Sequence, residues 1–129
     1  MDSLKEMEEE FGEHAYFLFV YIAEAHATNE WPIGDNLVTG RNVIQPTTLS
    51  ERHVEARHFA EKFKTKWPVA VDSPELGDPF LKAYAPWPTR FYIVKDGKMA
   101  FVAYPNDNHS FDLDPLRQCL HSAVRGDLY

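Results

Sequence analysis

One uninterrupted apolar run, YFLFVYIA at residues 16–23, limits the folds open to this chain more than any other feature. Its aromatic and branched side chains do not alternate with polar ones, which is typical of a strand covered on both faces, as in parallel sheets. Such a strand requires helices on both sides of its sheet. The run is also far shorter than the roughly 20 residues that cross a membrane as a helix, so no membrane segment is predicted.

The length and charge of the chain restrict its class. We predict a single domain over residues 1–129, because this length can bury a substantial core. A net charge of -7 repels phosphate backbones, so no nucleic-acid partner is expected. Met1 is followed by acidic residues rather than by a signal peptide, which predicts a cytoplasmic protein as the chain is given. The single cysteine, Cys119, excludes an internal disulfide and a cysteine-rich zinc site.

Helical and strand patterns alternate along the chain. Helices are predicted over residues 2–13, 50–65, 73–85 and 112–126, and strands over 16–23, 67–72 and, as a hairpin turning at Asp96 and Gly97, 89–105. Ser50 is the predicted N-cap of the second helix, and Pro74 the first residue of the third, after Ser73. Residues 27–49 show no period, and a loop of this length usually has a function. The order predicts an α/β fold in which the hairpin forms the antiparallel edge of a mixed sheet.

An acid and an imidazole directly follow the apolar run. Glu24 and His26 are two residues apart, so they would project from the same face if the strand continued through both. The carboxyl ends of parallel strands are where open α/β sheets bind ligands. The pair is therefore either catalytic, with His26 donating a proton and Glu24 orienting its ring, or a solvated strand end.

Two further residues could contact a substrate. Trp31 either stacks on an aromatic ligand or closes the core under the long loop. Arg90 either binds a carboxylate or phenolate or forms a surface ion pair. The residues alone do not decide between these alternatives for Trp31 or for Arg90.

Other reactive side chains have simpler interpretations. His53 and His58 lie about 140° apart on a helix, unlike the i, i+4 histidines of a zinc helix, so no metal is expected. Cys119 lies in mid-helix between Leu116 and Leu120, which favours a packed apolar residue over a nucleophile. We expect no cofactor.

The segment VYIAEAHATNEWP, residues 20–32, resembles the iodothyronine deiodinases, in which a core strand ends in a Glu-Ala-His triplet followed by a Trp. The matching positions are Tyr21, Ile22, Glu24, Ala25, His26 and Trp31. APWPTRFYIVKDGK, residues 85–98, is similar to the second half of the thioredoxin fold, whose proline, here Pro88, is usually cis and lies beside the redox centre. SERHVEARHFAEKF resembles the family's middle helix, and the likeness extends more weakly over nearly the whole chain.

This resemblance implies a thioredoxin-like, peroxiredoxin-related fold with a mixed sheet flanked by helices, and reductive removal of iodine from thyroid hormones. It implies that His26 and Glu24 are catalytic and that Arg90, Trp31 and Pro88 bind the substrate. The implied substrate is a small aromatic, iodothyronine-like molecule, and a thiol cosubstrate is expected.

The chain departs from the family in two places. The family's selenocysteine or cysteine nucleophile precedes the helix that here begins at residue 2, so we expect the first βα unit and the nucleophile to lie upstream of Met1. The chain would then be the C-terminal part of the catalytic domain, and a membrane anchor further upstream stays open. Thr47 and Thr48 stand where some members carry a further histidine.

Two other functions fit the same residues. The chain could be a non-catalytic thioredoxin-like module that binds a ligand or a protein partner. Without its first βα unit it would have an exposed sheet edge, which favours a homodimer. A general thiol peroxidase or disulfide reductase of the same fold is the third possibility, because a fold does not fix its substrate.

Overall fold

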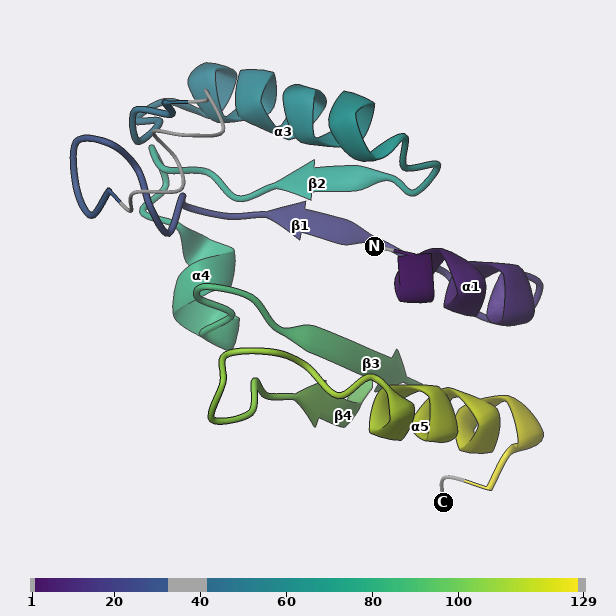
Figure 1. The fold of residues 1–129 in the computed structure, drawn as a ribbon. Helices are drawn as coiled ribbons and strands as arrows, with labels where there is room; N and C mark the ends of the chain where they lie inside the picture. Colours follow the sequence, from purple (N-terminus) through teal and green to yellow (C-terminus); the bar gives the residue numbers. More distant parts are fainter. Residues whose placement is uncertain (1, 33–41, 128–129) are drawn as a thin grey trace. The chain divides into compact units, whose positions relative to one another are not determined.

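The computed structural model describes residues 2–32 and 42–127. Its helices and strands are α1 (Asp2–Phe11), β1 (Phe19–Tyr21), α3 (Leu49–Phe63), β2 (Val69–Val71), α4 (Pro79–Tyr84), β3 (Phe91–Lys95), β4 (Lys98–Ala103) and α5 (Asp114–Arg125) (Figure 1). The chain divides into two compact units, a central unit (Leu18–Pro88) and a terminal unit (Met1–Phe17 with Thr89–Tyr129). This element content confirms the predicted α/β class.

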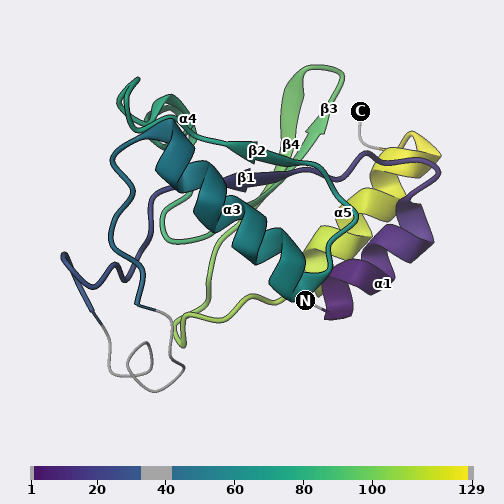
Figure 2. The ribbon, with the colours of Figure 1, turned by 90° about the horizontal axis from the view of Figure 1, so that it is seen from above.

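The central unit is built on a parallel pair of strands. Phe19 of β1 lies opposite Val69 of β2, and α3 packs on this pair (Figure 2). The ring of Phe19 meets the edge of Phe59 from α3 at 5.2 Å and stacks on Trp67 at 4.7 Å. The apolar run therefore does supply a parallel strand. That strand is shorter than predicted and half-buried, and Tyr16 before it is 80% exposed.

Helix α3 begins earlier than its predicted cap, and Thr48 replaces Ser50 as the N-cap. The Thr48 hydroxyl accepts from the backbone N–H of Glu51 at 3.2 Å, and the Glu51 carboxylate accepts from the backbone N–H of Thr48 at 3.2 Å. Ser50 has His53 three residues later, so it has no acid to complete such a box. Backbone N–H groups of Thr47 and Thr48 hold the pKa of Glu51 below its usual value.

Helix α4 begins at Pro79 and not at Pro74. The carboxylate of Asp72 accepts from the backbone N–H groups of Phe80 and Leu81, both at 2.9 Å, and so satisfies the first turn that starts at Pro79. The residues after Pro74 form a turn instead. The described parts of the predicted loop, 27–32 and 42–48, contain no helix or strand, and its other positions up to residue 41 lie outside the described residues.

The terminal unit combines the predicted hairpin with the first and last helices. Strands β3 and β4 are antiparallel, and Asp96 and Gly97 both have positive φ, which suits a two-residue turn. Figure 2 shows α1 and α5 side by side. The core of this unit is formed by apolar side chains of α1, β3 and α5: Met7, Phe11, Ile93, Leu116 and Leu120.

Strand pairing among the described residues is confined to β1 with β2 and β3 with β4. The parallel pair and the hairpin are thus confirmed. Three further features stay predictions. They are the union of these strands in one mixed, thioredoxin-like sheet, the single domain over 1–129, and the missing first βα unit.

The capping box of α3 leads to a stability prediction. We expect Thr48→Ala to lower the free energy of unfolding by about 1 kcal/mol, because an N-cap oxygen satisfies an otherwise unpaired N–H. Ser50→Ala is the matched control and should leave stability nearly unchanged. Urea denaturation of the three proteins measures both effects. Equal losses in the two variants would contradict Thr48 as the cap.

Candidate functional site

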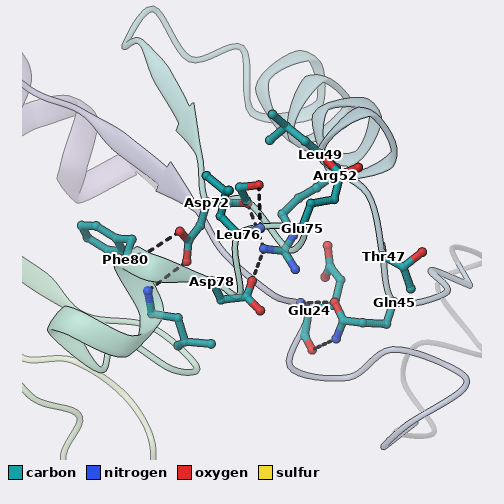
Figure 3. A network of polar contacts seen from close by, with 12 residues as sticks. Glu24, Gln45, Thr47, Leu49, Arg52, Asp72, Glu75, Leu76, Asp78 and Phe80 are labelled. Carbon is teal, nitrogen blue, oxygen red and sulfur yellow. Dashed lines mark hydrogen bonds and ion pairs between the residues drawn. The ribbon is translucent and has the colours of Figure 1, made fainter.

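Glu24 is held in place through its backbone by Gln45. The Glu24 N–H donates to the Gln45 side-chain oxygen at 3.0 Å, and the Gln45 amide nitrogen donates to the Glu24 carbonyl at 2.9 Å (Figure 3). The same amide nitrogen donates to Glu30 at 3.0 Å, and the Gln45 N–H donates to Asn29 at 2.9 Å. Gln45 therefore fastens the segment that follows β1 to the chain leading into α3.

The Glu24 carboxylate accepts a hydrogen bond from the Tyr21 hydroxyl, which comes from the last residue of β1. The ring of Tyr21 in turn lies edge-on to Phe59 of α3, with centroids 5.9 Å apart. The acid is thus anchored to the end of the strand and to the helix above it. Its predicted role in orienting His26 stays a prediction.

His26 is oriented by the backbone of Trp31. Its Nδ1 lies 3.2 Å from the Trp31 carbonyl oxygen, and its ring lies edge-on to the indole with centroids 5.4 Å apart. A carbonyl oxygen only accepts, so Nδ1 carries the hydrogen in this contact. In the neutral ring the lone pair is then on Nε2, the arrangement that a histidine acid or base requires.

Trp31 does not close a core. It is 61% exposed, which contradicts the core alternative. Its indole is stacked with that of Trp87, with ring centroids 6.3 Å apart and planes inclined by 17°. The Trp87–Pro88 peptide bond is cis, as the resemblance implied for Pro88.

Arg90 belongs to the terminal unit, whereas the other four predicted site residues belong to the central unit. Its Nη1 donates to the Thr89 carbonyl at 2.7 Å, and its guanidinium lies 5.1 Å from the centre of the Tyr104 ring. The arginine therefore has a defined local setting. Substrate binding by Arg90 and Pro88 stays a prediction.

Two buried polar side chains support the region beside this site. Arg52 of α3 is 1% exposed, and its Nη1 donates to the Asp72 carbonyl at 2.9 Å and to the Asp78 carboxylate (Figure 3). Asp72 is 4% exposed and binds the first turn of α4. Together they tie α3 to the turn before α4, which leads on to Trp87.

Three residues that contact or support the candidate site are not predicted from the sequence. Gln45 is a single amide in an aperiodic segment, which gives no signal. Trp87 stands directly before Pro88 in the thioredoxin-like segment, so its position was available as a signal. Arg52 lies in the charged stretch ERHVEARH, residues 51–58, where burial cannot be inferred from composition.

The remaining histidines and the cysteine considered above do not form a metal site or an activated nucleophile among the described residues. His53 and His58 are exposed on α3, and no cluster of three or more His, Cys, Asp or Glu side chains could hold a metal among the residues that the structure describes. Cys119 is half-buried on α5, and burial raises the pKa of its thiol. A raised pKa disfavours the thiolate, the reactive form.

None of the described helices is long and apolar enough to cross a membrane.

The two hydrogen bonds between the Gln45 side chain and the Glu24 backbone, here called the Gln45 clamp, can be tested directly. We expect Gln45→Ala to cost about 1–2 kcal/mol of stability, because two hydrogen bonds to the Glu24 backbone are lost. Hydrogen exchange of the Glu24 amide should accelerate as well. Gln118→Ala, the same change at an exposed position of α5, is the control. Unchanged exchange at Glu24 in Gln45→Ala would refute the clamp.

Comparison with known proteins identifies the family. A sequence profile described as iodothyronine deiodinase matches residues 1–123. The type I iodothyronine deiodinase of Xenopus laevis is 33% identical over 92 residues, which are 71% of this chain and 34% of that protein. The chain thus spans about a third of the length of this relative. With its profile match over nearly the whole length, the chain belongs to the iodothyronine deiodinase family.

Proposed function

We propose that this chain supplies the proton-donating and ring-binding part of an enzyme that reductively removes iodine from iodothyronines or related aromatic iodides. The observation that carries the proposal is the geometry of His26. Its Nδ1 lies 3.2 Å from the Trp31 carbonyl while its ring flanks the exposed Trp31 indole. A proton donor beside an aromatic surface is what protonation of an aromatic carbon requires.

The proposed reaction has two stages. A selenolate or thiolate of the complete enzyme attacks the iodine atom, and the electron pair of the carbon–iodine bond passes to the ring carbon. His26, protonated on both nitrogens, gives the Nε2 proton to that carbon. The selenenyl or sulfenyl iodide then reacts with two molecules of a thiol cosubstrate. Iodide, a disulfide and two protons are formed; one proton returns to His26, the other is released, and the selenolate or thiolate is restored.

The hydrogen bond at Nδ1 suits this role. Nδ1 carries a hydrogen in both the neutral and the protonated ring, so its contact with the Trp31 carbonyl can persist through proton transfer. Glu24 acts as a positioning residue in this proposal, because Tyr21 and Gln45 fix it at the end of β1. Substrate binding by Pro88 and, within the terminal unit, by Arg90 remains part of the proposal.

The nucleophile is proposed to lie outside these 129 residues. Cys119 supports this placement, because it is half-buried in the middle of α5 and burial raises the pKa of its thiol. A thiol of this kind is a poor nucleophile at neutral pH. The proposal needs no metal or cofactor beyond the thiol cosubstrate.

The test uses the protein expressed together with its upstream reading frame. With thyroxine and dithiothreitol we expect iodide release, and His26→Asn should lower kcat by about 100-fold or more. Asparagine keeps an N–H donor near the Nδ1 position but has no titratable group to replace Nε2. His14→Asn makes the same change in an exposed turn after α1 and is the control.

The outcomes separate the candidate functions. Wild-type kcat in His26→Asn would refute His26 as the proton donor. Rapid reduction of hydrogen peroxide without iodide release would instead identify a thiol peroxidase. A protein that performs neither reaction would favour the non-catalytic module.

A further inference from the structure

Trp31 and Trp87 form a pair of exposed indoles that come from distant parts of the central unit. Their ring centroids are 6.3 Å apart and their planes are inclined by 17°. Trp31 is 61% exposed and Trp87 is 40% exposed. Indoles that served only to pack would be expected to bury each other more fully, since each offers a large apolar surface.

The two indoles lie further apart than another stacked aromatic pair of the same unit. Aromatic pairs in proteins have centroid distances of about 4.5–7 Å, and this pair lies near the upper end of that range. By contrast, Phe19 and Trp67 stack at 4.7 Å within the same unit. Exposed indole faces offer a flat ligand an apolar surface to stack on.

The pair is coupled to His26 through Trp31. The imidazole lies edge-on to the Trp31 indole at 5.4 Å, and the Trp31 carbonyl lies 3.2 Å from Nδ1. One residue thus contributes both to the aromatic surface and to the orientation of the histidine. A ring bound on the indoles would be placed next to the imidazole.

From this geometry we infer that Trp87 and Trp31 together bind a planar aromatic ring, and that Trp87 is a substrate-positioning residue. The inference rests on the proposed function and extends it, since it assigns Trp87 to the site. Nearly parallel planes present a stacking surface to a flat ring. An organic cation is bound by aromatic faces that converge on one point, which these two planes do not do.

The test is a titration of the 129-residue chain with 4-iodophenol, followed through the three indole N–H signals in NMR spectra. The signals of Trp31 and Trp87 should shift, whereas that of Trp67 should not. Trp87→Leu should weaken binding by about tenfold, and Trp87→Phe should recover most of the affinity because it retains a ring. Tyr84→Leu, which removes another exposed aromatic ring of the central unit, is the control and should bind normally.

Two results would overturn the inference. One is wild-type affinity for 4-iodophenol in Trp87→Leu. The other is stronger binding of tetramethylammonium than of 4-iodophenol, which would indicate a cation site. These experiments measure binding without turnover, so their failure leaves iodide release by the longer protein as an independent test of the proposed function. Absent iodide release with intact iodophenol binding would refute the function alone.

Discussion

The paired hydrogen bonds between Gln45 and the backbone of Glu24 are the constraint on which the rest of the candidate site depends. The segment after β1 has no helix or strand of its own, so its backbone groups need partners elsewhere. Gln45 supplies an acceptor and a donor to the same residue, at 3.0 and 2.9 Å. Together with the Tyr21 hydroxyl, this amide fixes the position of Glu24, two residues before His26.

A second set of polar contacts places the other half of the aromatic pair. Arg52 binds the carbonyl of Asp72, and the Asp72 carboxylate binds the start of α4. The chain leaves α4 at Tyr84 and soon reaches Trp87. Buried charges are costly unless paired, so retaining them here fits a need for a fixed geometry rather than for stability alone. Both ends of the candidate site thus rely on hydrogen-bonded side chains instead of a deep apolar core.

The sequence predicted those features that depend on local pattern. The hairpin is predicted by Asp96 and Gly97, because a two-residue turn has local chemical requirements. Helix α5, predicted over residues 112–126, does end at a glycine, Gly126, with positive φ. The cap of α3 is also a local feature, because Thr48 and Glu51 have the spacing of a capping box, so the prediction of Ser50 was wrong. The start of α4 at Pro79 rather than at the predicted Pro74 depends on Asp72, whose carboxylate binds the first turn of that helix.

Features that depend on contacts across the fold could not be predicted. Glu24, His26 and Trp31 were identified because they are close in sequence and resemble a family motif. Gln45 contacts Glu24, and Trp87 contacts Trp31, from distant positions in the sequence. The residue types alone do not predict these contacts. The exposure of Trp31 likewise required the structure, because the residues alone allowed a core position as readily as a binding surface.

The proposed role of His26 depends on the orientation of its ring by the Trp31 carbonyl. The direct measurement is the ring tautomer of His26 at a pH where the imidazole is neutral, from its 15N chemical shifts. We expect a hydrogen on Nδ1 and the lone pair on Nε2. A hydrogen on Nε2, with an unprotonated Nδ1, would contradict it.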